Sequence, residues 1–272
     1  MRRALVLSGG GPVGIGWEAG LITGLAAAGV ELKQANAVVG TSAGSVVGAQ
    51  LTSGRALADI VPVFAQTPSW MSSGMLAGSP DLGEMFAGGG GDTVPEEEYV
   101  AGFAVLSGTE WPETFRCTAV EVDSGRFVAW DQAAGVEVHR AVASSCSLPG
   151  IAPAVTIAGG RYIDGGARGD MLNVDLVTGH DVVVAVSCVV LEPPDGQVPE
   201  LLTGFLPEIR RRIEELRFTG SAVKVIEPSD EVRVLSGWGR YLMDHSRTEA
   251  AFDAGVRQGG AEASHLGPFW SV

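Results

Sequence analysis

The pattern of apolar positions at the start of the chain predicts alternating strands and helices. Residues 4–8 form a continuous apolar run bounded by glycines, which is typical of a strand that is buried on both faces. The elements predicted after this strand are, in order, a Gly-rich turn at 9–14, a helix at 16–28, a strand at 37–39 and a helix at 44–54. A parallel sheet is built from this strand–helix alternation.

Further along, the pattern predicts more elements for the same sheet. Asp123-Ser124-Gly125 separates two apolar segments, 114–122 and 126–130, and therefore predicts a hairpin. The remaining predictions are a helix that begins near Pro95, helices near 136–145, 200–218 and 246–258, and strands at 161–163, 181–190 and 231–235. The predicted fold class is α/β, a three-layer arrangement around a mainly parallel central sheet.

Residues 67–93 interrupt this pattern. Apolar side chains such as Trp70, Met71 and Met75 are mixed there with Pro, Ser and Gly, and four glycines end the segment. We predict a mobile insertion in a single domain that spans residues 1–272, because no repeat or clean linker divides the chain. One hypothesis is that the insertion covers a functional site, since Met adapts to varied ligands. The alternative is an insertion that simply packs on the core.

Composition and charge narrow the class of protein. Hydrophobic residues make up 46% of the 272 residues and charged residues 18%, which is typical of a globular chain. A formal net charge of −14 disfavours nucleic acid as a partner, and also anionic lipid headgroups. The apolar run at the N-terminus is too short for a signal peptide, and none reaches the ~20 residues that span a bilayer. We therefore expect a cytoplasmic protein with three reduced cysteines.

Gly40-Thr41-Ser42-Ala43-Gly44 matches the G-x-S-x-G nucleophile elbow and lies between a predicted strand and a predicted helix. A sharp turn at this place lifts the hydroxyl of Ser42 clear of the backbone. The N-terminus of the following helix adds positive potential where negative charge develops. Ser42 is therefore the candidate nucleophile, with a helix-capping serine as the alternative.

Two further glycine motifs complete a candidate site. Glycine lets backbone amides converge on an anionic oxygen, so the segment Gly9 to Gly14 is interpreted as an oxyanion hole for Ser42, made by Gly9, Gly10, Gly11 and Ala43. The competing interpretation, a dinucleotide or phosphate loop, lacks the G-x-G-x-x-G spacing and a Walker lysine. Asp164, in Asp164-Gly165-Gly166, is the candidate base, since a partly desolvated carboxylate can take the proton of a serine.

The order of the motifs argues against an α/β-hydrolase, which places several strands before its nucleophile and a histidine near its C-terminal end. Only one strand and one helix precede the strand of Ser42. The histidines are expected to be surface or capping residues, although two of them lie in the order that a Ser–His–Asp triad requires. They are His139, His180, His245 and His265.

Taken together, these motifs resemble the bacterial patatin-like phospholipase family. The family carries a Gly-rich oxyanion motif, a G-x-S-x-G elbow, an Ala-Ser-x-x-x-Pro segment and a D-G-[Gly/Ala] motif in this order. Here they are Gly9 to Gly14, Gly40 to Gly44, the segment 143–149 and Asp164 to Gly166. The resemblance is good over 1–54 and 140–175 and poor over 60–110.

The resemblance implies a patatin-like fold and a serine acyl-ester hydrolase with a Ser42–Asp164 dyad and no metal or organic cofactor. A lipid or acyl-ester substrate is the expected partner, with peripheral membrane contact. Val13 departs from the family pattern, which has Arg or Lys there, close to the oxyanion. Val13→Arg is therefore expected to give a modest gain in rate or none. The rival interpretations are a lipid-binding protein without turnover and a nucleotide-binding module.

Overall fold

A computed structural model describes residues 1–66, 68 and 94–271 of the chain. In this part of the chain, eight strands form one sheet, with the order β5-β6-β3-β2-β1-β7-β8 and β4 paired with β3. The strands are β1 (Arg3–Leu7), β2 (Ala37–Gly40), β3 (Phe115–Glu121), β4 (Phe127–Trp130), β5 (Val155–Ile157), β6 (Gly160–Asp164), β7 (Val182–Val186) and β8 (Ala222–Ile226).

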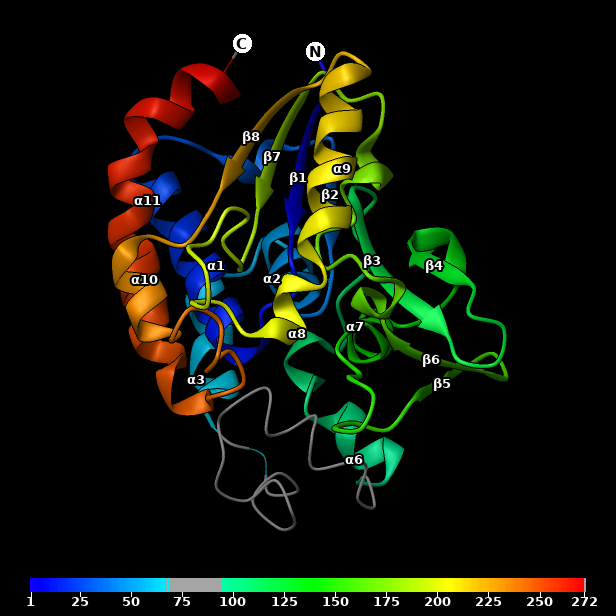
Figure 1. Cartoon of the computed structure of the whole chain (residues 1–272). Helices are drawn as coiled ribbons and strands as arrows, with labels where there is room; N and C mark the ends of the chain where they lie inside the picture. Colours follow the sequence, from blue (N-terminus) through cyan, green and yellow to red (C-terminus); the bar gives the residue numbers. More distant parts are fainter. Residues whose placement is uncertain (67, 69–93, 272) are drawn as a thin grey trace.

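The sheet is mixed but mainly parallel at its centre. The pairs β1–β2, β1–β7, β2–β3 and β7–β8 are parallel, while β3–β4, β3–β6 and β5–β6 are antiparallel. Figure 1 shows the parallel strands side by side and the antiparallel β4, β5 and β6 at one side of the molecule. β1 and β7 are almost fully buried apolar strands, as their continuous apolar sequences require.

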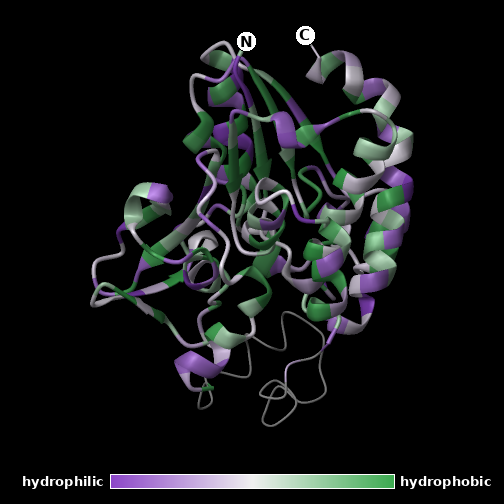
Figure 2. Cartoon of the chain, turned by 180° about the vertical axis from the view of Figure 1, so that it is seen from behind, coloured by the Kyte–Doolittle hydropathy of each residue, from purple (hydrophilic) through white to green (hydrophobic). Residues whose placement is uncertain are grey.

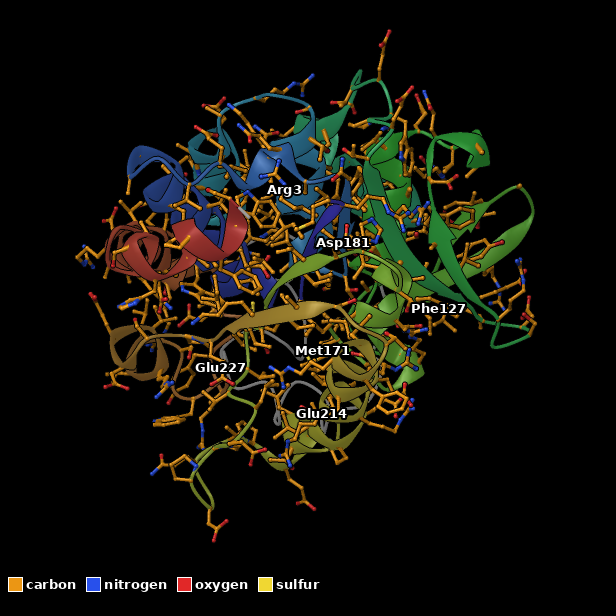
Figure 3. The ribbon with its side chains drawn as sticks, turned by 90° about the horizontal axis from the view of Figure 1, so that it is seen from above. Arg3, Phe127, Met171, Asp181, Glu214 and Glu227 are labelled. Atoms are coloured by element: carbon orange, nitrogen blue, oxygen red, sulfur yellow. The ribbon has the colours of Figure 1, made fainter. Side chains whose placement is uncertain are left out.

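Helices cover both faces of the parallel part. Seen from above, α1 and α11 lie on one face of the strands and α9 on the other, so the predicted three-layer α/β class is confirmed (Figure 3). The central strands are the most hydrophobic elements, and the outer helices mix apolar and polar residues (Figure 2). The helices are α1 (Gly11–Ala27), α2 (Ala43–Thr52), α3 (Val61–Phe64), α6 (Glu96–Ala101), α7 (Val138–Ser145), α8 (Glu200–Thr203), α9 (Leu206–Phe218), α10 (Asp230–Leu235) and α11 (Thr248–Trp270).

Several predicted elements are confirmed and some are wrong. The hairpin is the antiparallel pair β3–β4, and the helix near Pro95 is α6, for which Pro95 is the N-cap residue. The first helix already begins at Gly11, inside the predicted turn. The predicted strand at 231–235 is wrong, since these residues belong to α10, whose start is capped by the side chain of Ser229.

The structure does not test two predictions about the organisation of the chain. The insertion predicted at 67–93 falls, apart from Pro68, outside the described residues. The single-domain organisation of residues 1–272 stays a prediction. The buried apolar residues of the described part form one core cluster, which extends from β1 to the end of α11.

α1 packs along α11 through glycines, and this contact tolerates no added side-chain atom. An ideal Cβ at Gly20 would lie 2.0 Å from the carbonyl oxygen of Phe252 in α11. Gly16 and Gly24, one helical turn before and after, approach the Thr248 and Val256 carbonyl oxygens in the same way, with a Cβ at 2.2 Å. These three glycines lie on one face of α1, because positions i and i+4 share a helix face. They therefore let the backbones of α1 and α11 come into direct contact.

We expect Gly20→Ala to lower the free energy of unfolding by about 1–3 kcal/mol, because one helix must move away from the other. Gly260→Ala is the matched control, since a Cβ at Gly260 of α11 has nothing within 4 Å and alanine favours a helix. Urea unfolding of both variants measures the difference. A Gly20→Ala protein as stable as the Gly260→Ala protein would contradict the close helix contact.

Candidate active site

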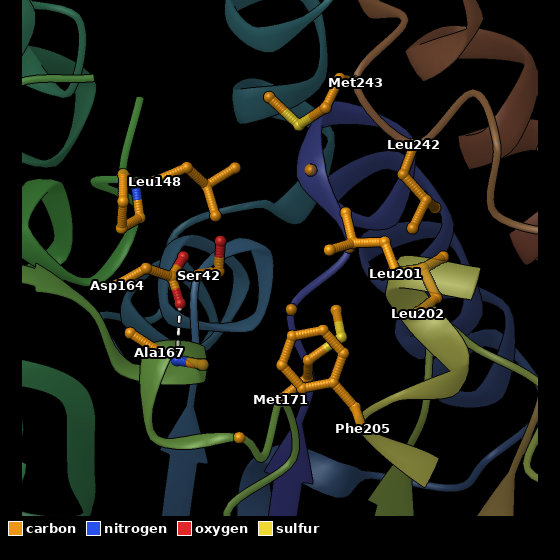
Figure 4. Close-up of a pocket in the computed structure, with 16 residues that line it drawn as sticks. Ser42, Leu148, Asp164, Ala167, Met171, Leu201, Leu202, Phe205, Leu242 and Met243 are labelled. Atoms are coloured by element: carbon orange, nitrogen blue, oxygen red, sulfur yellow. Dashed lines mark hydrogen bonds between the residues drawn. The ribbon is translucent and has the colours of Figure 1, made fainter. Parts of the chain in front are cut away.

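The two candidate catalytic residues come together because two strands meet end to end along β3. β4 pairs with one edge of β3, while β2 and β6 share the other edge, since Cys117 is paired with both Gly40 and Trp130. β2 ends at Gly40, opposite Cys117, and the antiparallel β6 ends at Asp164, opposite Ala119. The carboxyl ends of β2 and β6 therefore converge on each other. Ser42 and Asp164, which follow or end these strands, lie side by side (Figure 4).

Ser42 has the strained backbone of a nucleophile elbow. Its φ of 52° and ψ of −119° lie in a region that residues with a side chain rarely adopt. The flanking glycines make the turn sterically possible: a Cβ at Gly40 would lie 2.2 Å from the Gly44 carbonyl oxygen, and one at Gly44 would lie 2.3 Å from the Leu7 carbonyl oxygen. The G-x-S-x-G spacing thus follows from two close backbone approaches around Ser42.

Asp164 is buried, with an exposed fraction of 3%. Its Oδ1 accepts a hydrogen bond from the Gly166 amide at 2.7 Å, and its Oδ2 has no hydrogen-bond partner within the described residues. Burial raises the pKa of this carboxyl from 3.8 to about 6, and the Gly166 amide and the Ser42 hydroxyl oppose the rise. A carboxylate with one satisfied oxygen, one unsatisfied oxygen and a raised pKa is suited to accept a proton.

The segment 145–147 holds the nucleophile and the base together. The amide of Ser42 donates to the hydroxyl of Ser145 at 3.0 Å, and the thiol of Cys146 donates to the Ser42 carbonyl oxygen at 3.3 Å. On the other side, the Asp164 amide donates to the Ser147 carbonyl oxygen at 2.9 Å. The sequence signalled this segment only as a family motif, and these contacts are its physical role.

The glycine loop before α1 supplies backbone amides next to Ser42. The amide of Gly9 donates to the Met171 carbonyl oxygen at 3.0 Å, so it is already engaged. In the part of the chain that the structure describes, no hydrogen bond is formed by the amides of Gly10, Gly11 and Ala43, which lie at the first turns of α1 and α2. Gly11 has a φ of 57°, and a Cβ there would lie 2.5 Å from the Leu242 carbonyl oxygen.

A buried hydrogen-bond network that the sequence analysis did not predict holds the glycine loop in place. Glu18 on α1 is fully buried and accepts from the Ser8 amide at 2.9 Å, while the hydroxyl of Ser8 donates to the Gly9 carbonyl oxygen and accepts from the Cys188 amide. Burial raises the pKa of Glu18 well above its usual value, and the hydrogen bond from the Ser8 amide opposes the rise. A charged residue in an otherwise apolar helix stretch was the signal available in the sequence.

A second missed group sits between the ends of β2 and β6. The Thr41 and Thr118 hydroxyls are 2.8 Å apart, and the side-chain amide of Asn173 donates to Thr41 at 2.7 Å. Asn173 itself is in the left-handed conformation with a φ of 56°. These polar groups satisfy one another in the buried space where the strands meet. No sequence pattern links residues so far apart in the chain.

Two apolar cavities meet at Ser42. The first, of about 260 Å³, is lined by the glycine loop, Asp164 and apolar residues that include Met171, Leu201 and Phe205. The second, of about 440 Å³, lies beside the start of α2 and is lined by residues that include Ile15, Phe103 and His245. Four residues line both cavities, namely Gly11, Ser42, Leu148 and Met243. The Ser42 hydroxyl therefore stands at the junction of two apolar spaces, and Figure 4 shows the residues that line the smaller one.

None of the four histidines forms a hydrogen bond or ion pair with Ser42 or Asp164 within the described residues. His245 comes closest, since it lines the larger cavity, but its Nδ1 is 2.7 Å from the Phe64 carbonyl oxygen. Burial lowers the pKa of His245 below its usual value, so this imidazole is neutral near pH 7. His139, His180 and His265 line neither cavity.

Val13 does not reach the site. Its side chain is 1% exposed and belongs to the apolar core, and it lines neither cavity, whereas its neighbours Pro12 and Ile15 line the larger one. The expectation that a cation at this position would lie close to the oxyanion therefore has no support in this fold. The identity of residue 13 is a matter of core packing in this chain.

We expect Val13→Arg to destabilise the fold by about 3 kcal/mol or more, because it buries an unpaired charge and overfills the core. Val13→Leu is the control, since it adds bulk without charge and should cost at most about 1–3 kcal/mol. Thermal unfolding of both variants, with an ester assay of the folded fraction, measures the effect. A folded Val13→Arg protein with a faster reaction would restore the oxyanion role.

The described residues contain no group of three His, Cys, Asp or Glu side chains that could hold a metal ion. In the same ranges, no helix combines the length and apolar character needed to cross a membrane.

The fold and the site define an α/β protein with a serine at a nucleophile elbow, next to a buried carboxylate and unpaired amides. The model of the patatin-like phospholipase family matches residues 5–178 of the chain, and the chain belongs to this family. Members of the family are generally serine lipid acyl hydrolases. The match includes the glycine loop, the elbow and the Asp164 motif.

Two of the solved structures that are similar to this chain are VipD and ExoU. VipD from Legionella pneumophila is 13% identical with a TM-score of 0.46, over 93% of this chain and 67% of VipD. The type III effector ExoU is 15% identical with a TM-score of 0.38, over 95% of this chain and 53% of ExoU. This chain thus spans about half the length of ExoU. No curated protein matches the sequence.

Proposed function

We propose that the protein is a serine acyl-ester hydrolase that uses Ser42 as nucleophile and Asp164 as general base. The observation that carries the proposal is the pairing of the strained Ser42 with the unsatisfied Oδ2 of a buried Asp164 whose pKa is raised to about 6. Membership of the patatin-like phospholipase family supports a lipid acyl ester as the substrate. Both catalytic side chains line the smaller cavity.

In this proposal, the Ser42 Oγ attacks the acyl carbonyl carbon while Oδ2 of Asp164 takes the hydroxyl proton. The amides of Gly10, Gly11 and Ala43 stabilise the oxyanion of the tetrahedral intermediate, and the N-terminus of α2 adds its positive potential. Gly9 is left out of the oxyanion hole, because its amide already binds Met171. Collapse of the intermediate breaks the ester bond, and the alcohol leaves with the proton from Asp164.

Water then completes the reaction. It attacks the acyl-enzyme carbonyl, and Asp164 takes one of its protons, so that Ser42 regains a proton when the second tetrahedral intermediate collapses. The products are the free fatty acid and the alcohol. The apolar cavities exclude bulk water from the carboxylate, which is the same burial that raises the pKa of Asp164.

A pH profile tests the base. Because the carboxyl must be ionised to accept a proton, kcat/KM for a nitrophenyl ester is expected to rise as pH increases through about 6 and then to level off. The titration of the free enzyme sets this inflection, and His245→Gln should leave it in place. An inflection that disappears in the His245→Gln protein would assign the base to the imidazole.

A further inference from the structure

The catalytic residues do not determine which alcohol group of the ester the site can bind. The side chains that line the two cavities do bear on this. Among the described residues that line the two cavities, none is lysine or arginine, and Asp164 is the one carboxylate. His245 is the one imidazole, and burial lowers its pKa, so it adds no positive charge near pH 7. Both spaces that meet at Ser42 therefore lack a cation.

The residues outside the described ranges do not supply one either. Between Arg55 and Arg116 the sequence contains no lysine or arginine, and this stretch includes every residue that the structure leaves undescribed except Val272. Neither the described residues that line the cavities nor the undescribed residues of this stretch therefore include a lysine or arginine.

Three arginines lie close to the site in sequence, and one of them, Arg240, two residues before Leu242, lines neither cavity. The other two are held elsewhere. Arg168 follows the lining residue Ala167, but its guanidinium binds Asn173 and Asp175 and lies over the ring of Phe127. Arg247 follows His245 closely, and it binds the Asp244 carboxylate at 2.7 Å and the Leu235 carbonyl oxygen at 2.8 Å. Neither arginine lines a cavity.

A phosphate group would have no partner in these spaces. Proteins bind phosphate with arginine, lysine or helix N-termini, and burying an unpaired anion is very costly. The two helix N-termini at the site, those of α1 and α2, carry the amides that the proposed mechanism gives to the oxyanion. The ionised Asp164 and the net charge of −14 add repulsion.

We propose that the site selects esters whose acyl and alcohol parts are both uncharged and apolar, such as diacylglycerols, over the corresponding glycerophospholipids. This inference rests on the proposed function. One cavity receives the acyl chain and the other receives the apolar part of the alcohol, with the ester carbonyl at Ser42, where the cavities meet. The family name alone would favour the phospholipid.

A minimal substrate pair tests the proposal. Dioleoylglycerol and dioleoylphosphatidic acid contain the same oleoyl ester groups and differ by one phosphoryl group, and both are presented in the same excess of nonionic detergent. We expect the wild-type protein to hydrolyse the diacylglycerol with a kcat/KM at least about tenfold higher. Equal or faster hydrolysis of the phosphatidic acid would overturn the proposal.

A charge placed at the cavity should change this preference. Leu201 lines the smaller cavity and is 38% exposed, so an arginine there can stay solvated while it reaches a phosphate. Leu201→Arg is expected to lower the preference for diacylglycerol by about threefold or more, whereas Leu201→Gln leaves the ratio within about twofold. Phe218→Arg, at an exposed position that lines neither cavity, adds the same charge and should leave the ratio unchanged.

A nitrophenyl ester assay and fluorophosphonate labelling separate this proposal from the proposed function. A protein that is labelled at Ser42 and hydrolyses the nitrophenyl ester, but cleaves neither lipid or prefers the phospholipid, is a serine hydrolase without the inferred selectivity. A protein that is not labelled and hydrolyses no ester refutes the proposed function, and the selectivity with it.

Discussion

Ser42→Ala is expected to reduce hydrolysis of a short-chain nitrophenyl ester by ~10⁴-fold or more, to the background rate. Among the described residues that line the two cavities, Ser42 is the one serine or threonine, so none of the others offers a hydroxyl of this kind in its place. The hydroxyls of its neighbours are engaged: Ser45 donates to the Ser42 carbonyl oxygen at 2.6 Å, and Thr41 lies 2.8 Å from Thr118.

The fold should survive this substitution, since in the described part of the chain the partner of the Ser42 hydroxyl on another element is the carboxyl of Asp164, the proposed base. Ser53→Ala is the matched control, because Ser53 lies just after α2 and its hydroxyl donates to the Gln50 carbonyl oxygen, away from both cavities. It should keep full activity. Undiminished turnover by a highly purified Ser42→Ala protein would remove Ser42 from the mechanism.

Asp164→Asn is expected to be nearly as inactive as Ser42→Ala. Asparagine keeps the acceptor for the Gly166 amide, which lies 2.7 Å from Oδ1, but it cannot take the proton of Ser42. The loss should be about 10³-fold or more, and the Ser42→Ala/Asp164→Asn double variant should lose little further activity, because residues that act as a unit show non-additive losses. Steady-state kinetics of the three variants measure this coupling.

Stability measurements separate a catalytic role of Asp164 from a structural one. The pKa of this carboxyl rises from 3.8 to about 6 on folding, so the folded chain binds the proton more tightly. Ionised Asp164 therefore costs stability above about pH 6, and the cost disappears below about pH 4. Asp164→Asn removes that cost, so the inactive variant should be at least as stable as the wild type at about pH 8. A strongly destabilised variant would point to misfolding instead.

A histidine variant distinguishes a Ser–Asp dyad from a Ser–His–Asp triad. His245→Gln should keep most of the activity, because the imidazole contacts the Phe64 carbonyl oxygen and neither catalytic residue. If His245→Gln is as inactive as Ser42→Ala while circular dichroism shows an intact fold, the dyad is wrong.

Local sequence patterns predicted the parts of the fold whose signal is strong. The apolar runs at β1 and β7 are buried strands, and the turn at Asp123-Ser124-Gly125 joins β3 and β4. The edge strand β8 was missed, and α10 was taken for a strand, because Val232 and Val234 alternate with charged residues as in a strand. The cap at Ser229 is the local signal for a helix there.

The candidate catalytic pair could be inferred from the sequence, but its surroundings could not. Motif spacing identified Ser42 and Asp164, whereas their proximity depends on β2 and β6 meeting along one edge of β3. The engaged amide of Gly9 and the core position of Val13 depend on tertiary contacts with residues far along the chain, such as Met171. A sequence motif identifies candidate residues, whereas tertiary contacts determine which of their atoms are available at the site.

Stoichiometric labelling with a fluorophosphonate ester tests the central claim most directly. The reagent forms a covalent phosphonyl bond only with an activated serine hydroxyl, and intact-mass spectrometry with peptide mapping counts and locates the adduct. We expect one adduct per chain, at Ser42, with none in Ser42→Ala and much slower labelling in Asp164→Asn. An unlabelled wild-type protein, or an adduct at another residue, would contradict it.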